Sequence, residues 1–149
     1  MRKIILQAIV ALLPLTAGPH AEEVHKVERG TEGLSVIRFH LVNETDRPLA
    51  CAAAIAHWYS AELGTAAPHG ELSAQLWSRP KTGEVFLLNR NQDNMPVQTL
   101  WCGFAGADVS TRSDILLARR AGAVEPAIEL RCTATEGGAT LECRRAVAD

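Results

Sequence analysis

The sequence predicts an all-β fold, a small antiparallel β-sandwich of about seven or eight strands stapled by disulfide bonds. Three observations favour this fold class. Short segments alternate between apolar and polar residues, turn-forming residues recur at intervals of roughly ten residues, and four cysteines form an even set. An α+β fold with a helix near residues 48–63 is the alternative.

Residues 1–21 have the build of a secretory signal peptide. Arg2 and Lys3 provide a positive start, and residues 4–17 are almost entirely apolar. This run is shorter than the roughly 20 residues that a membrane-spanning helix needs. Small residues follow, and we expect cleavage after Ala21, with no transmembrane segment in the chain that remains.

The remaining chain has the length of one domain. We expect residues 22–32 to form a flexible N-terminal arm and residues 33–149 to form a single β-sandwich-like domain. Cleavage removes two basic residues and no acidic one, which lowers the formal net charge by two, from −2 to −4. This acidic balance argues against nucleic acid as a partner, because binding it requires clustered lysine and arginine.

The composition indicates a bacterial protein. Arginine outnumbers lysine twelve to three, and alanine is abundant, which is typical of GC-rich genomes. An exported protein of such an organism is periplasmic or secreted. The basic doublets Arg119-Arg120 and Arg144-Arg145 are isolated, and we expect them to be solvated or ion-paired surface.

The first predicted strand lies in GLSVIRFHLVNETDRPL, residues 33–49, where apolar and polar residues alternate. One face holds Ile37, Phe39 and Leu41, and the other holds Arg38 and His40. Residues 43–48 combine Asn, Asp and Pro and therefore predict a turn.

Further strands are predicted between later turn signals. ELSAQLW places Leu72, Ala74 and Leu76 on one face, and SRPKTG follows as a turn. The apolar run EVFLLN ends at NRNQDN, and the strands PVQTLWC and SDILLARR are separated by GFAGAD. Together with a C-terminal hairpin, these segments give the short, regularly spaced strands of a sandwich.

The alanine-rich segment RPLACAAAIAHWYSAELG, residues 47–64, is compatible with two structures. Asp46 and Pro48 near its start and Gly64 at its end are helix start and stop signals. As a strand, it would place one set of residues on one face: Leu49, Cys51, Ala53, Ile55, His57 and Tyr59. We predict a strand, because the segments on both sides are β.

The segment IELRCTATEGGATLECRRAV, residues 128–147, predicts a β-hairpin with Cys132 opposite Cys143. Gly137 and Gly138 suit its turn because glycine accepts positive φ. In this register one face is largely apolar and the other largely polar, and a slip by one residue would mix them. A four-residue loop over residues 136–139 makes the cysteines a non-hydrogen-bonded pair, in which the Cβ atoms lie closer together and suit a disulfide.

An oxidising compartment would pair all four cysteines. If Cys132 pairs with Cys143, then Cys51 pairs with Cys102, and this is the connectivity that we predict. No cysteine pair has the short spacing of a structural zinc site, and no C-x-x-C motif indicates a redox role. We therefore interpret the cysteines as structural.

The order of Cys51, Trp77 and Cys102 raises the question of an immunoglobulin domain. In those domains the tryptophan follows the first cysteine closely, whereas Trp77 lies midway, and Leu100 stands where they have a tyrosine. The sequence therefore supports the sandwich architecture without membership of that family.

The alternative hypothesis, a metal-handling function, depends on the histidines and Met95. No two histidines have a short ligand spacing, but Met95 with two of His40, His57 and His69 could form a copper site, because thioether and imidazole suit copper. The alternative is therefore a periplasmic metal-handling protein. No motif for nucleophilic, metalloprotease, phosphate-binding or dinucleotide-binding chemistry is present, so we expect a non-enzymatic protein without a cofactor.

The segment AHWYSAEL places His57, Trp58 and Tyr59 next to one another, with two of the seven aromatic residues of the chain. On one continuous strand, Tyr59 would face the core and Trp58 would lie beside small alanines. A large ring in such a place forms either the wall of a groove or a seat for another element. We interpret these three residues as the possible binding surface of an exported envelope protein whose partner is a protein or a glycan.

Overall fold

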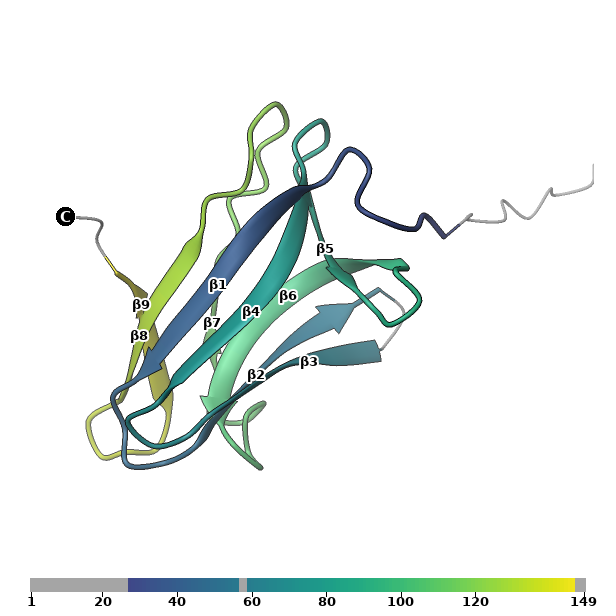
Figure 1. Cartoon of the computed structure of the whole chain (residues 1–149). Coiled ribbons are helices and arrows are strands. Elements are labelled where there is room, and N and C mark those ends of the chain that lie inside the picture. Colours follow the sequence, from purple (N-terminus) through teal and green to yellow (C-terminus); the bar gives the residue numbers. More distant parts are fainter. Residues whose placement is uncertain (1–26, 57–58, 147–149) are drawn as a thin grey trace, which may run out of the picture.

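The computed structural model describes residues 27–56 and 59–146 (Figure 1). Within these ranges the chain forms nine strands and no helix, so the all-β prediction is confirmed. The predicted signal peptide, residues 22–26, His57 and Trp58 lie outside them. The described residues accordingly contain no helix that could cross a membrane. The strands are β1 Ser35–Asn43, β2 Leu49–Ile55, β3 Tyr59–Ala66, β4 Glu71–Arg79, β5 Glu84–Leu88, β6 Asn94–Phe104, β7 Ser113–Asp114, β8 Ile128–Ala134 and β9 Leu141–Arg145.

The strands are ordered β3-β2-β6-β5-β4-β1-β8-β9, and β7 pairs with β6 beside this path. The paired strands are antiparallel except β1 and β8, which are parallel. The sheet is therefore mixed rather than purely antiparallel as predicted. The physical reason is that β8 reaches the edge of β1 by a long connection instead of a hairpin.

Strand β6 joins the two halves of the sheet. Its residues 94–96 pair with β5, and its residues 97–104 pair with β2. The register with β2 shifts at Gln98, which is the extra residue of a β-bulge, and bulges bend a strand and increase its twist. Figure 1 shows β6 as a long curved strand, with β4 on one side and β2 and β3 on the other. The sheet folds over along β6 into a sandwich-like arrangement.

The two halves bury their facing sides in one core. Strand β1 buries Ile37, Phe39 and Leu41 and exposes Arg38, as predicted. Strand β4 buries Leu72 and Leu76. The facing half contributes Leu49, Cys51, Ala53, Ile55, Val97, Leu100, Cys102 and Phe104. Burying a large apolar side chain stabilises a fold by about 1.5–3 kcal/mol, so this cluster is the main source of stability.

The C-terminal hairpin has the predicted register. Cys132 pairs with Cys143, and the two form a disulfide with a Cα–Cα distance of 4.1 Å. The N–H of Thr135 donates to the carbonyl of Thr140 at 2.9 Å, which leaves the predicted four-residue loop over residues 136–139. The cysteines are thus a non-hydrogen-bonded pair, whose Cα atoms come closer than those of a hydrogen-bonded pair.

The second predicted disulfide is also present. Cys51 of β2 and Cys102 of β6 are direct cross-strand partners, bonded with a Cα–Cα distance of 4.1 Å. This bond joins neighbouring strands, whereas the immunoglobulin disulfide joins opposite sheets. All four cysteines are bonded, and these bonds fit an oxidising environment of the extracellular type.

The described part of the predicted arm, residues 27–32, lies against the turn between β5 and β6. The N–H of Gly30 donates to the carbonyl of Gln92 at 2.9 Å, and the N–H of Asn94 donates to the carbonyl of Glu28 at 2.8 Å. The guanidinium of Arg79 on β4 also pairs with the Glu28 carboxylate. These contacts hold residues 28–30 on the domain.

Two predicted strands are shorter than expected. The segment 113–120 was expected to be one strand, but only Ser113–Asp114 pairs, and residues 115–120 leave the sheet. The segment 49–59 was expected to run straight, but it turns back between Ile55 and Tyr59, which are cross-strand partners. No glycine, proline or asparagine marks this turn, so the sequence carried no signal for it.

Candidate binding site

The predicted binding surface at His57, Trp58 and Tyr59 is only partly described. His57 and Trp58 lie outside the described residues. Tyr59 is the first residue of the edge strand β3 and is 60% exposed, so the expectation that it faces the core is wrong. The hairpin turn before Tyr59 breaks the alternation on which that expectation depended. A role for these three residues in binding stays a prediction.

His40 lies on the outer face of β1 between two carboxylates. Its Nδ1 is 3.0 Å from Glu129 Oε2 on β8, and its Nε2 is 3.2 Å from Glu71 Oε2 on β4. The hydrogen bond to Glu71 is the largest cause of a raised His40 pKa, and Glu129 adds to it, whereas desolvation opposes the shift. Through these two ion pairs, His40 connects β1 to β8 and to β4.

Ser73 of β4 is the cross-strand partner of His40. A serine, a histidine and two carboxylates thus share one face of the sheet, which is a combination that nucleophilic catalysis uses. Both ring nitrogens of His40 are engaged by carboxylates, so neither is free to take a proton from Ser73. We interpret this group as an ion-pair cluster that supports the sheet.

The remaining candidate copper ligands lie in separate places. His69 is in the loop between β3 and β4, with its Nε2 2.7 Å from Asp46 Oδ1. Met95 packs against the core, and His40 lies on the outer face. In residues 27–56 and 59–146, no cluster of three or more His, Cys, Asp or Glu side chains could hold a metal ion. Nothing in this arrangement favours a shared copper site.

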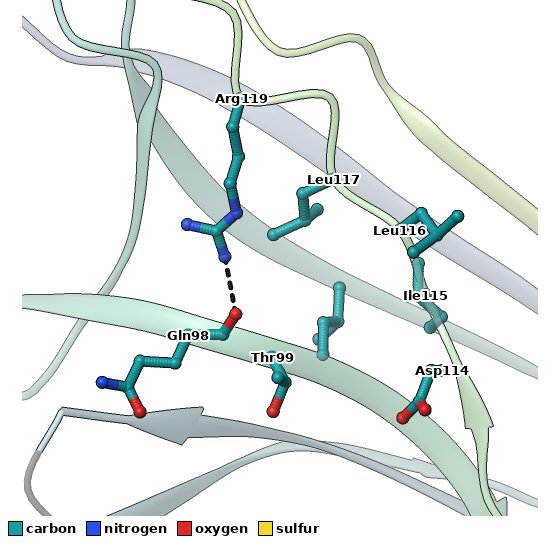
Figure 2. Close-up of a pocket in the computed structure, with 8 residues that line it drawn as sticks. Gln98, Thr99, Asp114, Ile115, Leu116, Leu117 and Arg119 are labelled. Atoms are coloured by element: carbon teal, nitrogen blue, oxygen red, sulfur yellow. Dashed lines mark hydrogen bonds between the residues drawn. The ribbon is translucent and has the colours of Figure 1, made fainter.

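A small pocket lies beside β6 where its neighbouring strands leave a gap. Strand β5 pairs with β6 as far as Pro96, and β7 pairs with it from Trp101. Between these points residues 115–119 run past β6 and enclose about 270 Å³ (Figure 2). We call this the β6 pocket. It is lined by Gln98, Thr99, Leu100, Asp114, Ile115, Leu116, Leu117 and Arg119.

The inner part of the β6 pocket is apolar. Leu100 and Ile115 are buried, and Leu117 is partly buried against the core. Leu116 is 83% exposed at the rim, and Figure 2 shows its side chain directed away from β6. An exposed leucine beside an apolar hollow adds contact area for an apolar ligand.

Arg119 extends over the pocket toward the bulge of β6. Its Nη2 donates to the carbonyls of Val97 at 2.7 Å and Gln98 at 2.9 Å, and Figure 2 shows the bond to Gln98. One nitrogen therefore fixes the guanidinium. Its Nε and Nη1 have no partner among the described residues and remain available to an anion.

The backbone of Arg119 is held in place by its neighbours. Its φ of 48° is in the left-handed region, which costs energy in a residue other than glycine. The buried carboxylate of Glu125 accepts hydrogen bonds from the N–H groups of Ala118 at 2.6 Å and Arg119 at 2.7 Å. At Gly83 a Cβ would lie 2.5 Å from the Arg119 carbonyl oxygen, so only glycine permits this approach. The loop is thus fixed from two sides.

The β6 pocket is lined by one cationic and one anionic side chain, Arg119 and Asp114. Arg112 Nε lies 3.1 Å from Asp114 Oδ1 and balances that carboxylate. Arg145 Nη2 donates to the carbonyl of Leu116 at 2.8 Å. The Asp114 carboxylate is thus paired with Arg112 outside the lining, which leaves the Arg119 guanidinium as the charge that faces a ligand. Within the lining, an anionic group would be bound by Arg119.

Neither Leu116 nor Arg119 was predicted as a site residue. The sequence placed both in a strand and treated Arg119-Arg120 as solvated or paired surface. The loop that borders the pocket is fixed by Glu125, which bonds the backbone of residues 118–119, and by Gly83, which permits their close approach. No local signal in the sequence reports such a long-range arrangement.

Comparison of this chain with protein-family models, with curated proteins and with solved structures finds no match. The fold and the site by themselves define a class, an all-β domain with two disulfide bonds and a small, apolar surface pocket with an arginine at its edge.

Proposed function

We propose that this chain is an exported, non-enzymatic binding domain of a bacterial envelope, acting in the periplasm or outside the cell. The observation that carries the proposal is the β6 pocket, which combines an apolar interior with an unused arginine donor on a rigid loop. The two disulfides support an oxidising location. The signal-peptide pattern of residues 1–21 supports export.

Fractionation of a bacterium that expresses the full chain tests the location. We expect the protein outside the cytoplasm, shortened by about 21 residues at its N-terminus, and without free thiols. Leu12→Arg with Leu13→Arg interrupts the apolar run and serves as the control, which should stay in the cytoplasm. An uncut chain with four reactive thiols in the cytoplasm would contradict the proposal.

Capture of envelope partners tests binding. The mature protein is immobilised, and the retained proteins and glycans are compared with those retained by Leu116→Asp, which places a charge at the exposed rim of the pocket. We expect a partner that the variant loses while both proteins unfold at the same temperature. Identical retention by the two proteins would rule out this pocket as the binding site.

A further inference from the structure

We infer that the β6 pocket binds the C-terminal residue of a peptide or protein chain, with the terminal carboxylate on Arg119 and an apolar last side chain in the hollow. This inference rests on the proposed binding function and names its ligand class. It follows from three properties of the site: its volume, its charge and its openness.

The volume suits a single side chain. At about 270 Å³, the hollow is smaller than the roughly 300–1,000 Å³ that enclose a drug-sized ligand. Its buried surface comes from Leu100 and Ile115, with Leu117 beside them. These groups recognise an aliphatic side chain by area alone, and the exposed Leu116 adds contact at the rim.

The charge suits a carboxylate. Arg119 keeps Nε and Nη1 free while Nη2 is fixed on the carbonyls of Val97 and Gln98. A preorganised guanidinium loses little freedom when it binds, and its hydrogen bonds to a carboxylate are charge-assisted. The one carboxylate in the lining, Asp114, is paired with Arg112 and so is balanced from outside the pocket. An apolar group that carries a carboxylate therefore complements both parts of the site.

Because the pocket is open to solvent, it favours the C-terminal end of a peptide chain over a small free carboxylic acid. The rim residues Gln98, Thr99, Asp114, Leu116 and Arg119 are all exposed. Small ligands normally have 70–90% or more of their surface buried in their pockets, and a free short acid would remain largely in water here. A peptide gains further contacts outside the hollow, so the residue in the pocket acts as the end of a longer ligand.

Titration of the ¹⁵N-labelled mature protein tests the inference. The probes are acetyl-Ala-Ala-Leu with a free carboxylate, the same peptide as its C-terminal amide, and 3-methylbutanoate. We expect the free acid peptide to shift the amide signals of residues 98–100 and 115–119. The peptide amide and 3-methylbutanoate should each bind at least about tenfold more weakly, because one lacks the charge and the other lacks the chain.

Substitutions in and beside the pocket test which residues bind the acid peptide. Arg119→Gln should weaken the acid peptide about tenfold, whereas Arg120→Gln, an exposed neighbour, should change its affinity less than about twofold. Leu116→Ala should weaken it severalfold while changes in the spectrum of the free protein stay confined to residues near 116, because this side chain is exposed. Leu116→Ala therefore keeps the test valid if Arg119→Gln perturbs the bulge.

Several results would overturn the inference. Equal binding of the acid and amide peptides would remove the role of the carboxylate, and equal binding of 3-methylbutanoate would make the ligand a free acid. If the peptide shifted the amide signals of other residues, or if Arg119→Gln bound it with unchanged affinity, this pocket would be excluded as the peptide site. The proposed binding function would still stand, with its site elsewhere on the domain. Failure of export in the fractionation experiment would instead contradict the proposed function.

Discussion

At the scale of single residues, His40 connects β1 to β4 and β8 through Glu71 and Glu129. Other charged groups on this face include Arg38 of β1, Arg79 of β4 and Glu84 of β5, which pair with each other, Arg131 of β8, which pairs with Glu44, and Glu142 and Arg144 of β9, which pair with each other. The Glu71 and Glu129 carboxylates raise the pKa of His40 above 6.5. A group with a raised pKa in the folded state stabilises the fold while it is protonated.

The stabilisation by His40 should therefore be complete below about pH 6.5 and be lost as the pH rises through its raised pKa. We expect His40→Gln to lower the free energy of unfolding by about 0.2–1 kcal/mol at pH 5.5, the range of exposed ion pairs, and by less at pH 8.5. Urea denaturation of both proteins at the two pH values measures this. A larger loss at pH 8.5 would contradict it, and Arg90→Gln, at an exposed turn residue, is the control.

The sequence predicts single residues well where alternation decides their environment. Ile37, Phe39 and Leu41 face the core because they alternate with polar neighbours on one long strand. It fails at Tyr59, because a turn without turn-forming residues reverses the chain before it. It also fails at Arg119, whose position depends on Glu125, a buried acid that no local pattern marks.

At the scale of elements, the β8–β9 hairpin could be predicted because several requirements agree on one register. The two glycines, the apolar face and the opposed cysteines all select the same pairing, and the structure has this pairing. The parallel pairing of β8 with β1 could not be predicted in this way, since its partners are far apart in the chain and no turn links them.

The two disulfides should contribute unequally to stability. Their sequence separations are 51 and 11 residues, and closing the longer loop removes more entropy from the unfolded chain. We expect Cys51→Ala with Cys102→Ala to lower the free energy of unfolding by about 4 kcal/mol, and Cys132→Ala with Cys143→Ala by about 3 kcal/mol. Urea denaturation of the two double variants measures the order, and the reverse order would refute the chain-entropy explanation.

At the scale of the whole molecule, β6 belongs to both halves of the sheet, and one core lies between them. Neither half has an interior of its own, so we expect the oxidised protein to unfold in a single transition. Thermal unfolding followed by far-ultraviolet and near-ultraviolet circular dichroism should give coincident curves. Two separated transitions would show that the halves fold independently.

The pairing of β1 with β8 also sets the order in which the fold can be completed during synthesis. β1 lies near the start of the described chain, yet one of its two neighbours is supplied by Ile128–Ala134 near the other end. Until that late strand emerges, one edge of β1 stays open to chaperones, proteases and other chains. The proposed export, in which an unfolded chain crosses the membrane and folds after release, would let β8 be present before β1 has to pair. A ribosome that stalls before Ile128 would leave a product that quality control recognises by its open edge.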